Sequence, residues 1–262
     1  MRIGYQGTLG SFSQIAAKKL FSNEELHNYY SFKDVIDGVM NGEINYGVLP
    51  IENSYTGEVS LVLDELRLSN VYIIEMYNLP ITQNLIGLKE SKLEDIKKVY
   101  SHEQALMQCS EFLKEKNYEM ISFANTALAS EYIKNENDIT KASIASELTA
   151  ELYGLKILIP AINNNKKNTT RFAVISKEIV NIKDHFAFMF TIKDSSGALA
   201  VILNEISRLG VNLTAISSHS THEEWKYYFY CEAEGRLDNS NIIELQKKLK
   251  EMCETFQIIG SY

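Results

Sequence analysis

The 262-residue sequence lacks the features that mark membrane, secreted and nucleic-acid-binding proteins. No apolar run approaches the roughly 18–20 residues that a membrane-spanning helix needs. Residues 1–5 enter a strand-like pattern without the apolar segment of a signal peptide. Basic residues number 26 against 34 acidic ones, and the net charge of −8 argues against a nucleic-acid-binding protein, whose affinity depends on Lys and Arg at phosphates. We therefore expect neither a membrane nor a nucleic-acid partner.

Cysteine is scarce. The chain has three, Cys109, Cys231 and Cys253, and this odd number shows no metal-ligand spacing. Such cysteines are typical of reduced thiols in a cytoplasmic protein, because disulfides form mainly in oxidising compartments. We expect a cytoplasmic location and no metal site.

The first 180 residues alternate strand-like runs with helical patterns. Strand-like runs occupy residues 3–5, 46–51, 71–74 and 84–88, and helical spacing marks 11–20, 59–66, 104–116 and 126–135. This alternation predicts an α/β fold with a largely parallel sheet and helices on both faces. In such sheets ligands bind at the carboxyl ends of the strands, where loops lead into helices.

The composition changes after residue 177. Strand patterns follow at 186–192, 211–217, 225–232 and 256–259, and helical patterns at 196–209 and 241–252. Their order along the chain is βαββαβ, the ferredoxin-like arrangement. The sequence therefore predicts two domains, residues 1–180 and residues 184–262.

Two polar loops follow strands near the N-terminus. Residues 7–13 form a glycine-containing loop before a helix, whose free N–H groups suit an anion, although a turn capped by Ser11 explains the same pattern. Residues 52–58 place several polar side chains between a buried strand and the next helix. Because a helix cap needs only one of them, this second loop favours a binding role.

Two further segments carry candidate side chains. Gln104 and Gln108, four residues apart, project from one face of a predicted helix, and His102 has no second histidine at metal-ligand spacing. Arg171 stands beside an apolar strand, where a guanidinium needs an anionic partner. That partner is either a carboxylate of the protein or an anionic ligand, and the residues alone leave both alternatives open.

Together these segments resemble the prephenate dehydratase family, and residues 184–262 resemble the ACT regulatory domain appended to it. The matching motifs are Gly4-Tyr5-Gln6-Gly7, Gly10-Ser11-Phe12-Ser13, Pro50-Ile51-Glu52-Asn53-Ser54, Ser101-His102-x-Gln104-x-x-x-Gln108-Cys109, Asn168-x-Thr170-Arg171-Phe172, Gly197-Ala198-Leu199-Ala200 and Asn212-Leu213-Thr214. The resemblance implies a bilobed catalytic domain similar to periplasmic binding proteins, with its site in the cleft, and an α+β ferredoxin-like ACT domain. It implies no cofactor.

The family converts prephenate to phenylpyruvate by expelling CO2 and water together, a carbon–oxygen lyase reaction of L-phenylalanine biosynthesis. By resemblance, Thr170 is the general acid or hydrogen-bond donor for the departing hydroxyl. Arg171 or helix N-terminal amides are expected to anchor a substrate carboxylate. The resemblance assigns catalytic roles to Thr170, Asn53, Ser101 and Gln108, and substrate binding to Thr8, Ser11, Ser13, Glu52, Ser54, Thr56, Gln104, Thr126, Arg171 and Phe172.

The sequence departs from the family pattern in three places. Glu103 stands where proline is usual, and Asn163-Asn164 where Gln-Asp is common. In the ACT region, Ser217-Ser218-His219-Ser220 replaces a Glu-Ser-Arg-Pro motif associated with phenylalanine binding. Two alternatives for the ACT region therefore stay open: it binds L-phenylalanine as an inhibitor, or it serves only oligomerisation. The resemblance implies a homodimer or homotetramer formed through the ACT domains. It places the L-phenylalanine site at Gly197, Ala198, Leu199, Asn212, Leu213, Ser217 and Ser218.

Three other functions compete with this assignment. An arogenate dehydratase performs the same elimination on the amino-acid analogue of prephenate. A non-catalytic sensor of prephenate or amino acids needs the cleft but not the Thr170-Arg171-Phe172 motif, and a prephenate decarboxylase has no use for an acid at Thr170. The motif therefore favours a dehydratase.

Overall fold

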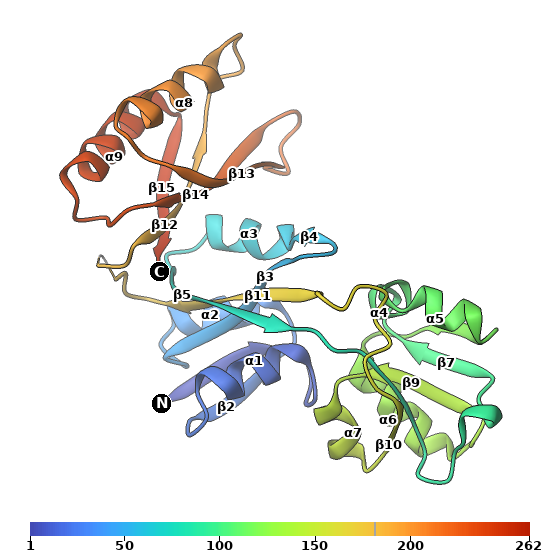
Figure 1. Ribbon diagram of the computed structural model, residues 1–262. Coiled ribbons are helices and arrows are strands. Elements are labelled where there is room, and N and C mark those ends of the chain that lie inside the picture. The colour runs from blue at the N-terminus through green and yellow to red at the C-terminus, as the bar shows by residue number, and fades with distance from the viewer. Residues whose placement is uncertain (181) are drawn as a thin grey trace.

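The computed structural model describes residues 1–180 and 182–262. Asn181 falls in the predicted junction between the domains and lies outside the described residues. The chain forms two lobes, the second inserted between two segments of the first, and a C-terminal domain that packs on the first lobe (Figure 1). Within the described residues, no helix has both the length and the apolar content needed to cross a membrane.

Lobe 1 contains residues 1–80 and 169–180. Its elements are β1 (Arg2–Gln6), α1 (Phe12–Leu20), β2 (Glu25–Tyr29), α2 (Phe32–Met40), β3 (Tyr46–Asn53), β4 (Gly57–Glu58), α3 (Ser60–Arg67), β5 (Tyr72–Pro80) and β11 (Thr169–Ser176). The strands lie in the order β5-β11-β3-β1-β2, and β1 is parallel to both β2 and β3. β11 is antiparallel to β3 and β5, so the sheet is mixed and not largely parallel as predicted. The reason is that β11 brings the chain back from lobe 2 in the opposite direction.

Lobe 2, residues 84–159, is built around a five-stranded sheet in the order β10-β6-β9-β7-β8. Its elements are β6 (Asn84–Gly87), a 3-10 turn η1 (Leu93–Asp95), β7 (Lys98–Ser101), α4 (Glu103–Gln108), α5 (Ser110–Glu115), β8 (Glu119–Ser122), α6 (Thr126–Glu136), β9 (Lys141–Ala145), α7 (Glu147–Tyr153) and β10 (Lys156–Ile159). Two connecting segments, 81–83 and 160–168, join it to lobe 1.

The helix predicted over residues 104–116 is broken at Cys109 into α4 and α5. The Gln108 carbonyl accepts the N–H of Asn164, from the second connecting segment, at 2.8 Å. A continuous helix would have used that carbonyl for its own next turn. The break therefore comes from a partner distant in the sequence.

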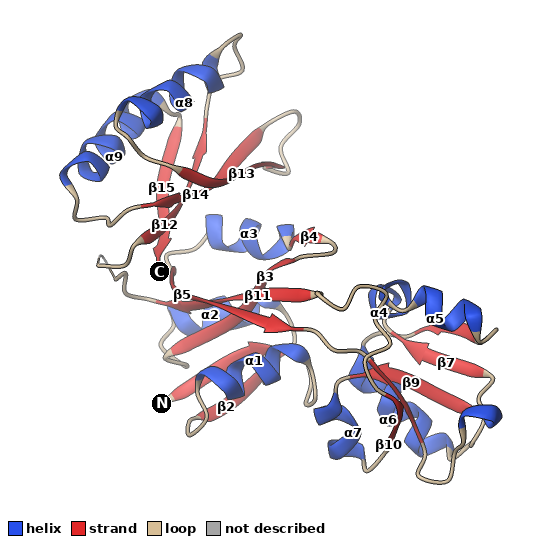
Figure 2. Ribbon diagram, viewed as in Figure 1, coloured by secondary structure: helices blue, strands red, loops and turns tan. Residues whose placement is uncertain are grey.

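The C-terminal domain has the predicted βαββαβ order, which confirms the ferredoxin-like fold. Its elements are β12 (His185–Thr191), α8 (Ala198–Arg208), β13 (Leu213–Ser220), β14 (Tyr227–Glu234), α9 (Ser240–Met252) and β15 (Thr255–Ser261). Helices α8 and α9 cover one face of its sheet (Figure 2), where Phe188, Ile202 and Leu245 share a buried core. The other face carries Met189 and Tyr228, which belong to the same core as Leu63 of α3. Lobe 1 and this domain thus share a core.

One close backbone contact joins the sheets of these two units. Gly260 of β15 pairs with Ile73 of β5 in parallel register, which makes a ten-stranded sheet. A Cβ atom at residue 260 would lie 2.2 Å from the Ile73 carbonyl oxygen. Glycine is therefore needed at this position for the backbones to approach.

Candidate active site

A cavity of about 300 Å³ lies between the two lobes. Both lobes and the first connecting segment line it. The predicted site residues on its wall are Ser11, Ser13, Asn53, Thr56, Gln104, Gln108, Thr126, Thr170 and Phe172. Segments that are far apart in the sequence therefore bring nine of the predicted side chains to one place.

Thr170 lies near the start of β11, directly opposite Asn53 on β3. Because side chains alternate along a strand, Thr170 and Phe172 face the cavity together. Asn53 Nδ2 donates a hydrogen bond to Thr170 Oγ1 at 2.9 Å. The strand register thus sets the distance between these two side chains.

The orientation of the Asn53 amide is fixed by the backbone. Its Oδ1 accepts the N–H groups of Tyr55 at 2.9 Å and Thr56 at 3.2 Å. A backbone N–H only donates, so the opposite end of the amide, Nδ2, must be the one that faces Thr170. Thr170 Oγ1 therefore accepts from Asn53, and its own proton has no acceptor among the described residues. That proton is free to be donated into the cavity.

The electrostatics of the cavity come from amides and helix ends. No Lys, Arg, Asp or Glu belongs to its wall in the described part of the chain, and His102 is the titratable side chain there. The N-terminal ends of α1 and α6 contribute Ser11 and Thr126, and each helix is capped by a side chain, Ser11 and Asn125 respectively. Helix N-termini attract anions through their free N–H groups and their dipole.

The lobes also touch across the cavity. Gln104 Nε2, on α4 of lobe 2, donates to Thr56 Oγ1 of lobe 1 at 2.9 Å. This bond links the loop that holds Asn53 to the opposite wall. The site is consequently assembled only when both lobes are in place.

Comparisons with known proteins support an assignment to a family. A profile of the prephenate dehydratase family matches residues 3–180, and a profile of the ACT domain matches residues 187–251. The chain belongs to the prephenate dehydratase family.

Two relatives and one solved structure illustrate the similarity within the family. A bifunctional chorismate mutase/prephenate dehydratase of Buchnera aphidicola subsp. Schizaphis graminum is 34% identical over 98% of this chain and 70% of its own length. A prephenate dehydratase of Lactococcus lactis subsp. cremoris is 30% identical over 100% of this chain and 97% of its own. The crystal structure of prephenate dehydratase from Arthrobacter aurescens in complex with L-Phe is 26% identical, has a TM-score of 0.93, and covers 100% of this chain and 90% of its own.

In this member of the family, Arg171 and Glu52 do not line the cavity. Strand alternation turns Arg171 to the face opposite Thr170, where both ends of its guanidinium bond Glu232 of β14, one at 2.9 Å. Glu52 lies 3.3 Å from the same guanidinium. Burial opposes the charge of Arg171, but attraction to Glu232 raises the pKa of the guanidinium overall. The structure therefore pairs Arg171 with carboxylates of the protein, one of the two alternatives that the sequence left open, and contact of Arg171 or Glu52 with the substrate stays a prediction.

Ser101, Thr8 and Ser54 also lie outside the wall of the cavity. Ser101 is fully buried, and its hydroxyl donates to the Ile144 carbonyl at 2.7 Å within lobe 2. Ser54 Oγ accepts the N–H of Thr169 at 3.0 Å, whereas Thr8 Oγ1 is buried and has no hydrogen-bond partner among the described residues. The hydroxyls of Ser101 and Ser54 thus bond backbone groups, and the roles expected for the three side chains stay predictions.

Some residues of the cavity were not predicted. Ile81 and Gln83 come from the first connecting segment, and Phe32 from the start of α2. Asn168 lies behind the wall and bonds Asn53. The Asn-x-Thr-Arg-Phe motif contained a signal for Asn168, whereas Phe32, Ile81 and Gln83 depend on tertiary structure.

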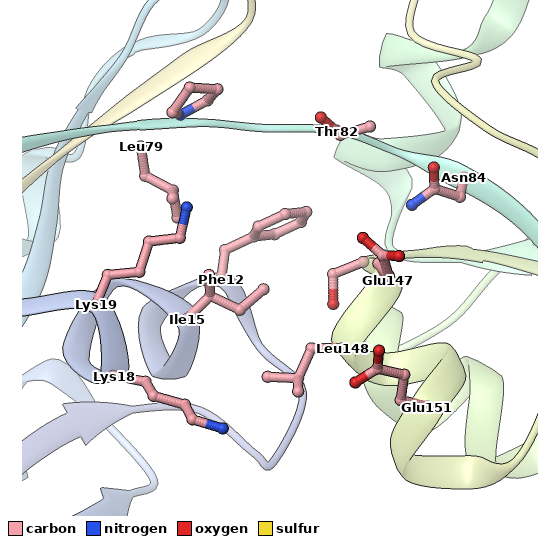
Figure 3. A pocket seen from close by; sticks show the side chains of 12 residues that line it. Phe12, Ile15, Lys18, Lys19, Leu79, Thr82, Asn84, Glu147, Leu148 and Glu151 are labelled. Carbon is pink, nitrogen blue, oxygen red and sulfur yellow. The ribbon is translucent and has the colours of Figure 1, made fainter. Parts of the chain in front are cut away.

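A second cavity, of about 380 Å³, lies on the other side of the first connecting segment (Figure 3). Thr82 and Asn84 line it, while the alternate residues Ile81 and Gln83 line the first cavity. Lysines project from α1 and glutamates from α7 on its two sides, namely Lys18, Lys19, Glu147 and Glu151. Because these charged side chains are exposed and Thr170 is absent from this wall, the first cavity is the candidate active site.

Residues 217–220 at the end of β13 contact lobe 1. Ser217 Oγ donates to Glu58 Oε1 at 3.0 Å, and His219 Nε2 lies 2.9 Å from Glu58 Oε2. Ser218, one position along, faces the other side of β13 and is exposed. Ser217 is thus occupied by a contact with lobe 1, while Gly197, at the N-cap of α8, adopts a left-handed φ of 83°.

Proposed function

We propose that this protein catalyses the decarboxylating dehydration of prephenate to phenylpyruvate, CO2 and water. The observation that carries the proposal is the Thr170 hydroxyl, which lies in the cavity between the lobes with its oxygen accepting from Asn53 and its proton free. A hydroxyl arranged in this way donates to an oxygen that leaves the substrate.

The chemistry asks little of the protein beyond this donor. As the ring becomes aromatic, the bond from ring carbon to hydroxyl breaks, the Thr170 proton passes to that oxygen to give water, and the ring carboxylate leaves as CO2. Negative charge develops on Thr170 Oγ1, and the Asn53 N–H stabilises it. A solvent proton then restores the hydroxyl.

The substrate has two carboxylates, and they need different treatment. We assign the pyruvyl carboxylate to the N-terminal ends of α1 and α6, because no cationic side chain lines the cavity in the described residues. The ring carboxylate would face neutral amides such as Gln108. Neutral donors hold it without the strong charge stabilisation that would oppose loss of CO2.

The ultraviolet absorbance of phenylpyruvate formed from prephenate tests the proposal. We expect turnover by the unaltered protein, a loss of about 10²–10⁴-fold in kcat for Thr170→Ala with little change in KM, and partial retention in Thr170→Ser. Near-normal turnover by Thr170→Ala would refute the role of this hydroxyl. Absence of any phenylpyruvate from the unaltered protein would refute the function.

We further propose that residues 1–180 form the catalytic domain and residues 184–262 a regulatory domain that binds L-phenylalanine in a homodimer or homotetramer. The support is the ACT profile match and the relative from Arthrobacter aurescens, whose structure is a complex with L-Phe. Titration calorimetry with L-phenylalanine tests it, and no heat at millimolar ligand would refute it.

We place the protein in the cytoplasm because its three cysteines are free thiols.

One observation favours arogenate as a second candidate substrate. Gln83 Oε1 is buried at the wall of the cavity and has no hydrogen-bond donor among the described residues. Arogenate carries an ammonium where prephenate has a keto group, and an ammonium can donate to such an oxygen. Kinetics on both substrates side by side decide between them by the ratio of kcat/KM.

A further inference from the structure

Behind Thr170 the structure holds a chain of buried side-chain amides. Asn53, Asn168 and Gln108 are 7%, 3% and 6% exposed. Asn53 Nδ2 donates to Asn168 Oδ1 at 2.9 Å, and Asn168 Nδ2 donates to Gln108 Oε1 at 3.0 Å. Gln83 Nε2 reaches the same Gln108 oxygen at 3.4 Å.

The donor-to-acceptor direction of this series of amides is set at the Asn53 end. The nitrogen and oxygen of an amide can exchange places, so each orientation must follow from its partners. Two backbone N–H groups fix the Asn53 oxygen, which turns its nitrogen toward both Thr170 and Asn168. Asn168 must then accept from Asn53 and donate to Gln108. The remaining end of Gln108, Nε2, has no acceptor among the described residues.

We propose that Asn168 is a positioning residue that orients both walls of the active site. Asn168 Oδ1 accepts from Asn53 Nδ2 and so keeps that nitrogen turned toward Thr170. Asn168 Nδ2 donates to Gln108 Oε1, so that Gln108 Nε2 is left as a donor toward the substrate. Asn168 itself is not part of the cavity wall. The inference rests on the proposed function, since it concerns the same reaction.

An asparagine is needed because the position requires one acceptor and one donor in a fixed plane. An aspartate has the same shape, but its ionised form only accepts. The Gln108 amide would then turn to donate to the carboxylate and present its oxygen to the anionic substrate. A protonated aspartate has one O–H donor and restores the original orientation. Burial favours that neutral form and raises the pKa of the new carboxyl above the ordinary value of about 4.

The test is the pH profile of Asn168→Asp with prephenate, compared with Asn165→Asp as a matched control. Asn165 lies in the same segment, is exposed, and uses only its Oδ1, which aspartate retains, to accept the Lys167 N–H. The charged residues and the histidine on the elements that hold Asn168 and its partners are Glu52 on β3, Arg171 on β11, His102 and Glu103 at the start of α4, and the exposed Lys166 and Lys167. They are common to both variants.

We expect kcat of Asn168→Asp to fall by about ten- to a hundredfold at neutral pH and to recover toward the wild-type value as the pH is lowered through the new pKa. The control should follow the wild-type profile throughout. Equal profiles for the two variants would overturn the proposal. If Asn168→Asp does not fold, Asn168→Ser should lose kcat without recovery at low pH, and an unchanged kcat would likewise overturn it.

Failure of the proposed function can be told apart from failure of this inference. Turnover of prephenate by the unaltered protein tests the function alone. Calorimetric titration with prephenate, in variants that also carry Thr170→Ala to slow turnover, tests the orientation of Gln108, because prephenate keeps the ring carboxylate that Gln108 would face. In this Thr170→Ala background we expect Asn168→Asp to bind prephenate about tenfold more weakly than Asn165→Asp at neutral pH, with the gap closing at acid pH, and equal affinities would count against the role of Asn168.

Discussion

Removing Arg171 should destabilise the protein more than it weakens substrate binding. The guanidinium is bonded to Glu232 at both ends and lies 3.3 Å from Glu52. The side chain of Glu232 is 5% exposed, and its other hydrogen bond comes from the Tyr230 hydroxyl at 2.8 Å. Arg171→Ala would therefore leave a buried carboxylate without its cation, a change that costs about 3–5 kcal/mol.

The reverse change should cost less. In Glu232→Ala, Arg171 keeps Glu52 as a partner, and its side chain is 26% exposed, so water can solvate part of the charge. We expect a loss of about 1–3 kcal/mol for this variant. The double variant should be more stable than the sum of the two losses predicts, because neither charge is then left alone.

Urea denaturation of the two single variants and the double variant measures these differences, and kinetics with prephenate measure KM in parallel. We expect a clear fall in the midpoint for Arg171→Ala with KM within about threefold of the unaltered protein, because the side chain lies on the face of β11 away from the cavity. A large rise in KM with unchanged stability would refute the reasoning and indicate that Arg171 binds the substrate.

Two further predictions concern the close contact at Gly260 and the buried thiol of Cys109. Gly260→Ala should lower the thermal midpoint and the stability of the joint between β15 and β5, because the new Cβ meets the Ile73 carbonyl oxygen at 2.2 Å; an unchanged melting curve would contradict this. Burial raises the pKa of the Cys109 thiol to about 12, so the unfolded chain loses this proton first as the pH rises. The free energy of unfolding should consequently fall from about pH 9 toward pH 12, by up to about 1.4 kcal/mol per pH unit from this thiol, and Cys109→Ala should show a shallower alkaline slope in urea denaturation.

Local sequence determined the elements and most of the site. Hydrophobic spacing gave the βαββαβ order of the C-terminal domain, and the polar loops marked Ser11, Asn53 and Thr170 correctly as neighbours of the cavity. Strand alternation also indicates that Thr170 and Arg171 point in opposite directions. Thr170 and Arg171 are adjacent in one strand, so they must face opposite sides, and only one of them can reach the cavity.

Tertiary structure alone decided which of the two sides faces the cavity and which groups meet there. β11 runs antiparallel between β3 and β5, and that register places Thr170 opposite Asn53. Asn168 meets Gln108 across 60 positions of the chain, and Glu232 reaches Arg171 across 61. Periodicity and capping depend on neighbours in the chain, so a sequence displays them directly. The direction of a buried amide or the partner of a buried charge depends on distant residues that come together only when the lobes and the C-terminal domain pack.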